Sequence, residues 1–164
     1  RRLVAFLRSI GFFDGSQFAY LKGLDTTQCL LALTLQIQQG FKEHKATIGA
    51  FIDLEGAFDA LWRNGCLYKL HRLGVRGRLW LSIVSFFKNR KSRNLINDFT
   101  SDWIQTEFGV PQGSIMAVIF FIVFVMDLGE EATNEIKYAD DITLWVTHLD
   151  INKLYWLWRK IFCW

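Results

Sequence analysis

Proline and cysteine are both scarce in this chain. Pro111 is the only proline among 164 residues, whereas an average protein of this length holds about eight. The three cysteines, Cys29, Cys66 and Cys163, are widely spaced and form no Cys-x-x-Cys pair. This spacing argues against a disulfide framework or a zinc site and favours reduced thiols inside the cell. The single proline therefore needs an explanation of its own.

A long apolar run is also lacking. The candidate run, Ile115–Val125, has 11 residues, and a helix needs about 20 to span a bilayer. A short helix that is apolar on every face is typical of a buried core. We therefore expect no membrane partner. The alternative, a membrane or scaffold protein built on this run, would leave the acidic residues of the chain without a use.

Aromatic residues, in contrast, are abundant. Apolar residues make up 51% of the chain and aromatics 16%, with seven Trp and fifteen Phe, which excludes a disordered chain. The length suits one domain, or the central part of a larger one. A net charge of +3 is compatible with nucleic-acid binding but is also common in other soluble domains.

The apolar pattern predicts a mixture of helices and strands without a regular alternation. Such a mixture favours an α+β fold, in which helices pack on one face of an antiparallel sheet. Expected helices cover about 25–39 (capped by Asp25, stopped by Gly40), 55–62, 66–73, 78–87, 114–128 and 151 onward (capped by Asp150). Expected strands cover 46–54, 95–96, 103–110, 136–139 and 142–147, with a polar turn at 97–102.

Three carboxylates occupy unusual places in this pattern. Asp140 and Asp141 lie between two short strands, where an ordinary acidic turn is one interpretation. Asp53, however, ends an apolar strand, and no Lys or Arg follows it before Arg63. If the two strand ends meet, the carboxylates repel one another until divalent cations bind, and Mg²⁺ prefers such oxygen ligands. Two ions about 3.5–4 Å apart can promote phosphoryl transfer.

Three segments together resemble a known family. They are Phe-Ile-Asp-Leu-Glu-Gly-Ala-Phe-Asp at 51–59, Gly-Val-Pro-Gln-Gly-Ser at 109–114 and Tyr-Ala-Asp-Asp at 138–141. In this order they are similar to the catalytic and nucleotide-pocket motifs of reverse transcriptases of non-LTR (LINE-type) retrotransposons, and the resemblance extends over residues 16–149. The lone proline falls where that family uses one. The resemblance implies a polymerase palm-type sheet (46–149), part of the fingers (1–45) and a truncated C-terminal helix (150–164).

The resemblance also implies roles for individual residues. Asp53, Asp140 and Asp141 would be catalytic and would hold two Mg²⁺ ions, with Mn²⁺ as the alternative ion. The Leu54 carbonyl would be an extra ligand.

Substrate contacts are implied for five further positions or stretches. Phe58 would be a steric gate against a ribose 2′-hydroxyl, or else a core aromatic. Gln112 and Gly113 would line the incoming nucleotide, and glycine permits close backbone approach. Tyr138 would support the primer end, or else pack on a neighbouring strand. The basic residues of 88–93 would contact template or primer phosphates, or else form a solvated loop: Lys88, Arg90, Lys91 and Arg93.

The chain departs from the family pattern at several points. Leu24-Asp25 stands where the family has Arg-Ser, Gly56 where a lysine is common, and Ile115-Met116-Ala117-Val118 where a small polar stretch and a proline are common.

The resemblance implies an intracellular (nuclear or cytoplasmic) RNA-directed DNA polymerase. Its partners would be an RNA template, a DNA primer, dNTPs, and the missing fingers and thumb segments of a longer polyprotein. The alternative function is a catalytically inactive or domesticated fragment that keeps the fold and binds RNA.

Overall fold

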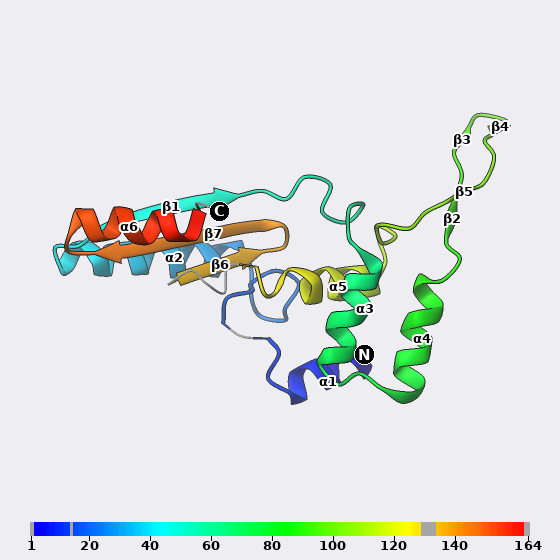
Figure 1. Ribbon diagram of the computed structural model, residues 1–164, viewed down its shortest axis with the longest axis horizontal. Coiled ribbons are helices and arrows are strands. Elements are labelled where there is room, and N and C mark those ends of the chain that lie inside the picture. The colour runs from blue at the N-terminus through cyan, green and yellow to red at the C-terminus, as the bar shows by residue number, and fades with distance from the viewer. Residues whose placement is uncertain (1, 14, 129–133, 163–164) are drawn as a thin grey trace. The chain divides into compact units, whose positions relative to one another are not determined.

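The computed structural model describes residues 2–13, 15–128 and 134–162 (Figure 1). The chain forms two compact units. The helical unit consists of residues 1–9 and 55–125, and the sheet unit consists of residues 10–54 and 126–164.

The sheet unit is built on three antiparallel strands in the order β1-β7-β6. These strands are β1 (Ala46–Ile52), β6 (Asn134–Tyr138) and β7 (Asp141–His148). β1 pairs with β7 from Ala46 opposite His148 to Ile52 opposite Ile142. β6 and β7 form a hairpin that closes with Tyr138 opposite Asp141, so its turn contains only two residues. Four residues of β7 are buried, three of them in succession at 144–146, so both faces of the middle of this strand are covered.

Two helices flank this sheet. α2 (Thr26–Lys42) contacts β1 and β6, and α6 (Ile151–Phe162) contacts β7 and β1. Asp25 begins α2 with a capping box, in which its carboxylate accepts from backbone amides and the Gln28 side chain accepts from the Asp25 amide. Asp150 caps α6, because its Oδ1 accepts from the Asn152 amide at 2.8 Å. Both predicted caps are confirmed.

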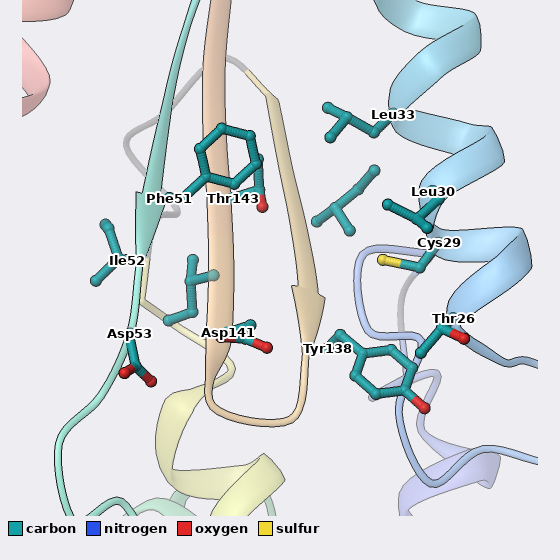
Figure 2. Close-up of a pocket in the computed structure, with 12 residues that line it drawn as sticks. Thr26, Cys29, Leu30, Leu33, Phe51, Ile52, Asp53, Tyr138, Asp141 and Thr143 are labelled. Carbon is teal, nitrogen blue, oxygen red and sulfur yellow. The ribbon is translucent and has the colours of Figure 1, made fainter.

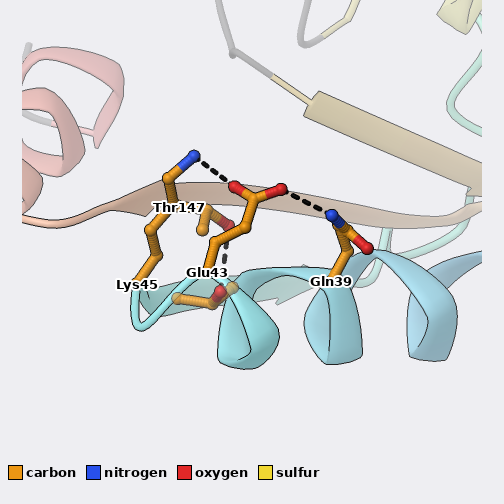
Figure 3. Close-up of polar contacts among 5 residues, drawn as sticks. Gln39, Glu43, Lys45 and Thr147 are labelled. Carbon is orange, nitrogen blue, oxygen red and sulfur yellow. Dashed lines mark hydrogen bonds and ion pairs between the residues drawn. The ribbon is translucent and has the colours of Figure 1, made fainter.

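The end of α2 is joined to β1 by a polar cluster (Figure 3). Glu43 accepts hydrogen bonds from the side chains of Lys45 and Gln39, and these bonds lower the pKa of the Glu43 carboxyl. Behind it, the hydroxyls of Thr47 and Thr147 hydrogen-bond across the β1–β7 ladder at 2.9 Å.

The helical unit contains four helices and a narrow arm among its described residues. The helices are α1 (Arg2–Ser9), α3 (Arg63–Arg72), α4 (Gly77–Phe87) and α5 (Ile115–Val125). In the arm, β2 (Lys91–Ser92) pairs with β5 (Ile104–Gln105), and β3 (Leu95–Ile96) pairs with β4 (Phe99–Thr100).

The core of the helical unit forms around α5. α3 packs against α5, and the rings of Phe86 and Phe87 contact Phe120. Seven of the 11 residues of α5 are buried, in agreement with its apolar composition. Within the described part of the chain, no helix is both long and apolar enough to cross a bilayer.

The α+β class with antiparallel pairing is confirmed, but two predicted elements are wrong. Residues 55–62 form turns rather than a helix, because Gly56 adopts a left-handed φ of 60° that a helix cannot continue through. Of the predicted strand 103–110, only Ile104–Gln105 is extended in a ladder. The carbonyls of Thr106, Phe108 and Gly109 accept hydrogen bonds from a side chain instead, as described below.

Three smaller boundaries also differ. β4 lies within the predicted polar turn 97–102. α5 is shorter than the predicted 114–128. α2 continues past the predicted stop at Gly40, where a Cβ would lie only 3.0 Å from the Thr147 methyl group. Gly40 therefore allows α2 to pack closely on the sheet.

Candidate active site

Asp53 and Asp141 lie at the same end of the central sheet. The β1–β7 ladder ends with Ile52 opposite Ile142. Asp53 follows Ile52 directly and Asp141 directly precedes Ile142, so the two aspartates are neighbours across the strands. Both carboxylates are exposed, and both line one pocket of about 400 Å³ in the sheet unit. The hypothesis that the two strand ends meet is therefore supported by the register.

The rest of this pocket is mainly apolar (Figure 2). One wall comes from α2 and the other from the strands, and the two carboxylates lie near the pocket's lower end in the view. The lining residues other than aspartate are Thr26, Cys29, Leu30, Leu33, Phe51, Ile52, Ile136, Tyr138, Ile142 and Thr143. Burial, and secondarily the Asp141 carboxylate, raises the pKa of the Cys29 thiol, so Cys29 remains neutral beside the acidic end.

The turn between β6 and β7 positions the remaining motif residues. Tyr138 ends β6 and lines the pocket, with its ring directed toward Thr26 of α2 (Figure 2). Ala139 has a left-handed φ of 58°, a conformation that costs an L-residue about 1–2 kcal/mol. Asp140 follows it, is half-exposed, and is not among the residues that line the pocket. The structure thus brings Asp53, Asp141 and Tyr138 together, with Asp140 in the adjacent turn.

The acidic end of the pocket has the donor chemistry for a hard divalent cation. Carboxylate oxygens are the ligands that Mg²⁺ prefers, and no Lys or Arg of the described chain forms an ion pair with Asp53, Asp140 or Asp141. Over the described residues, however, the side chains do not gather three acidic, histidine or cysteine groups around one point. Leu54, predicted to offer its carbonyl, is half-buried and follows Asp53 directly.

The predicted nucleotide-pocket residues belong to the helical unit. Their loop is joined to the chain after β1 by two backbone hydrogen bonds, from Gly109 N to Leu61 O at 2.8 Å and from Val110 N to Phe58 O at 2.9 Å. Gly109 has a φ of 76°, and a Cβ there would lie 2.6 Å from the Asp59 carbonyl oxygen. Only glycine fits such a close approach of two backbones.

Gln112 and Gly113 lie at the exposed end of this loop. The Gln112 side-chain amide donates to both carboxylate oxygens of Asp59, at 3.3 and 3.2 Å. Gly113 has a φ of 83° and open space around the position of a Cβ. Phe58 is half-buried and stacks on Phe121, with ring centroids 4.9 Å apart. Phe58 therefore contacts the buried core of the helical unit through the ring of Phe121.

The predicted nucleic-acid-binding residues lie on and beside the arm. Lys88, Lys91 and Arg93 are exposed and Arg90 is half-exposed. The two arginines pack on aromatic rings, since Arg90 lies 5.1 Å from the centroid of Phe86 and Arg93 lies 4.5 Å from that of Trp103. These cation–π contacts hold the guanidinium groups without neutralising them.

Comparison with known proteins decides the family. The profile described as "Reverse transcriptase (RNA-dependent DNA polymerase)" matches residues 1–159. The chain belongs to the reverse transcriptase family. The predicted resemblance to reverse transcriptases of non-LTR retrotransposons is therefore confirmed, over part of such a protein's length.

Individual relatives come from mobile elements of fruit flies. The RNA-directed DNA polymerase from mobile element jockey of Drosophila melanogaster is 31% identical over 112 residues, which is 63% of this chain and 12% of the relative. The probable RNA-directed DNA polymerase from transposon BS of the same species is 29% identical over 137 residues, 78% of this chain and 15% of the relative. The reverse transcriptase chain thus spans only about an eighth of the length of these relatives.

The sequence did not predict three residues of this reverse transcriptase chain that lie in or beside the motifs. Asp59 binds Gln112, and its place within the 51–59 motif was the available signal. Arg63 is 7% exposed and binds the 106–109 backbone; nothing in the local pattern indicates it. Lys137 is fully buried beside Tyr138, where its Nζ donates to the Met126 carbonyl at 2.6 Å and pairs with Glu135 at 2.9 Å. A lysine inside the short predicted strand 136–139 was the signal for Lys137.

Proposed function

We propose that this chain forms the polymerising centre of a retrotransposon reverse transcriptase, which extends a DNA primer on an RNA template. Membership of the family supports this reaction, and the observation that carries it is the opposed pair Asp53 and Asp141 at the end of the β1–β7 ladder. Because the chain spans a small part of its relatives, the activity of the whole protein is part of the proposal.

The proposed reaction is a nucleotidyl transfer. The primer 3′-hydroxyl oxygen attacks the α-phosphorus of a dNTP and loses its proton. A new oxygen–phosphorus bond forms, the bond to the β-phosphate oxygen breaks, and pyrophosphate leaves. Catalysis of such a transfer consists mainly of positioning and charge stabilisation.

Asp53, Asp140 and Asp141 would hold two Mg²⁺ ions, with Mn²⁺ as the alternative and the Leu54 carbonyl as a further ligand. The bound ions would stabilise negative charge on the transferring phosphoryl group and on the oxygens that attack and leave. Asp53 and Asp141 are exposed, and no cationic side chain among the residues that the structure describes pairs with them, which supports this use.

Gln112 and Gly113 would line the incoming nucleotide, and Phe58 would exclude a ribose 2′-hydroxyl. The stacking of Phe58 on Phe121 supports the gate, because this contact limits the freedom of the ring to turn away from an extra hydroxyl. Tyr138 would support the primer end beside the carboxylates.

Lys88, Arg90, Lys91 and Arg93 would contact template or primer phosphates, and such contacts add salt-dependent affinity without reading sequence. We further propose that fingers and thumb segments of a longer polyprotein complete the enzyme, which acts inside the cell, in the nucleus or the cytoplasm.

The alternative is a catalytically inactive or domesticated fragment that binds RNA. The lack of a three-ligand cluster within the described residues favours it. The change to Leu24-Asp25 does not favour it, because Asp25 has a structural use as the N-cap of α2.

Primer extension separates the two functions. An oligo-dT primer on poly-rA is incubated with dTTP, Mg²⁺ and the chain, an Asp140→Ala/Asp141→Ala variant, or an Asp53→Asn variant. We expect weak extension by the parent chain alone, since the fingers and thumb segments proposed above complete the enzyme, and at least about 100-fold less extension by both variants. Glu43→Gln, an exposed carboxylate of the same unit outside the pocket, is the matched control and should retain activity. Equal extension by the parent and the double variant would refute the proposed polymerase. RNA binding with no extension by any of the proteins would favour the fragment.

A further inference from the structure

We infer that Asp59 is a positioning residue of the nucleotide pocket, which orients the amide of Gln112, and that Arg63 fixes the loop on which Gln112 is carried. This inference rests on the proposed function, in which Gln112 lines the incoming nucleotide. It is carried by contacts within the helical unit alone.

The first step is the hydrogen-bond pair between two residues 53 positions apart. The Gln112 Nε2 lies 3.3 and 3.2 Å from the two Asp59 carboxylate oxygens. An ionised carboxylate can only accept hydrogen bonds, whereas a glutamine amide has a donor end and an acceptor end. Asp59 therefore selects one of the two orientations of the amide. The Gln112 carbonyl oxygen is left to accept from a donor group of the nucleotide.

The second step is the backbone beneath this pair. The Asp59 carbonyl lies against Gly109, and the residues on either side of Asp59 bind the loop through Val110 N to Phe58 O and Gly109 N to Leu61 O. The backbone of Asp59 and the start of the nucleotide loop consequently move as one body. This rigidity is what allows an exposed carboxylate to define the direction of a side chain.

The third step is Arg63, which binds the same loop from inside. Its Nε donates to the Gly109 carbonyl at 2.6 Å, and its Nη2 donates to the Phe108 carbonyl at 2.5 Å and to the Thr106 hydroxyl at 3.0 Å. Its Nη1 donates to the Thr106 carbonyl. Burial, and secondarily Arg90, lowers the pKa of the Arg63 guanidinium. Carbonyl dipoles of the loop thus solvate a buried cation, and a lysine ammonium cannot reproduce this planar fork.

The direct test is the side-chain amide resonance of Gln112 in a ¹⁵N-labelled chain, assigned by its loss in Gln112→Met. We expect Asp59→Ala to move this resonance, and Arg63→Lys to move or broaden it. Among the described residues, the Gln112 amide donates to Asp59 and not to Glu107. Glu107→Gln removes a carboxylate from the same loop and should therefore leave the resonance in place. Asp59→Leu keeps the approximate side-chain size and removes both acceptors, and it carries the test if Asp59→Ala does not fold. An unmoved resonance in the folded Asp59 variants would overturn the inference.

The kinetic test separates positioning from folding. In primer extension, Asp59→Ala should raise the KM for dTTP about 10-fold, as expected for one lost hydrogen bond to a charged group, with kcat changed less than about threefold. Asp59→Asn should recover part of the loss. An unchanged KM in Asp59→Ala would also overturn the inference. If the parent chain extends no primer, the proposed function fails, while the amide resonance still decides the inference.

Discussion

The loop that carries Gln112 should be sensitive to a single methyl group at Gly109. Replacing Gly109 with alanine has two separable costs. The φ of 76° costs an L-residue about 1–2 kcal/mol. The added Cβ would lie 2.6 Å from the Asp59 carbonyl oxygen and 3.0 Å from its Cα, and relief of such overpacking typically costs about 1–3 kcal/mol. We therefore expect Gly109→Ala to lower the free energy of unfolding of the helical unit by about 2–5 kcal/mol.

Gly77→Ala is the matched control for this change. Gly77 lies in the same unit and has a φ of 61°, but an added Cβ would have no neighbour within 4 Å. It should therefore lose only the conformational part, about 1–2 kcal/mol. Urea unfolding followed by tryptophan fluorescence measures both variants. Equal destabilisation by the two alanines would show that the close approach of the backbones contributes nothing, and would refute the reasoning.

Three further predictions concern a buried thiol, a helix cap and a strained turn. Burial raises the pKa of the Cys66 thiol to about 12 from an ordinary 9.0. The stability that the neutral thiol contributes is therefore complete below pH 9 and is lost as pH rises toward 12. Between pH 8 and 10, urea unfolding should show that the free energy of unfolding falls by about 1.4 kcal/mol, a fall that Cys66→Ala lacks. A slope shared by both proteins would assign the loss to other groups. Asp25→Ala should destabilise α2 by about 1 kcal/mol, seen as reduced helical circular dichroism during thermal unfolding; an unchanged melting curve would contradict the capping box. Ala139→Gly relieves a left-handed φ of 58° and should raise the free energy of unfolding of the sheet unit by about 0.5 kcal/mol, whereas a loss in urea unfolding would mean that the alanine side chain is needed in the turn.

Local features of the fold could be predicted from the sequence, because they depend on residues close together in the chain. The caps Asp25 and Asp150, and the buried helix within residues 114–128, follow from capping chemistry and apolar composition. From the sequence alone, the proximity of Asp53 to the Asp140-Asp141 turn could be stated only as a condition. It depends on the register of two strands about 90 residues apart, which no local pattern encodes.

One prediction failed because of a long side chain. Residues 103–110 have the composition of a strand, yet Arg63 occupies the carbonyls that a neighbouring strand would need. A local sequence pattern does not show which distant groups a long side chain contacts. Neither the binding of Arg63 to these carbonyls nor the contact of Asp59 with Gln112 could therefore be predicted. The metal ligands and the nucleic-acid contacts remain predictions.

The two units are interleaved along the chain in a way that bears on their synthesis. The helical unit is almost entirely contiguous, from residue 55 to 125, whereas the sheet unit needs β1 from before that segment and β7 from after it. At about 5–20 residues per second, a ribosome needs roughly 5 to 20 s between completing β1 and completing β7. During that interval the β1 edge has no partner, although the helices can already pack. The acidic pocket therefore forms only after the contiguous part of the helical unit has been synthesised, and an unpaired β1 is a segment in need of protection from aggregation while the chain emerges.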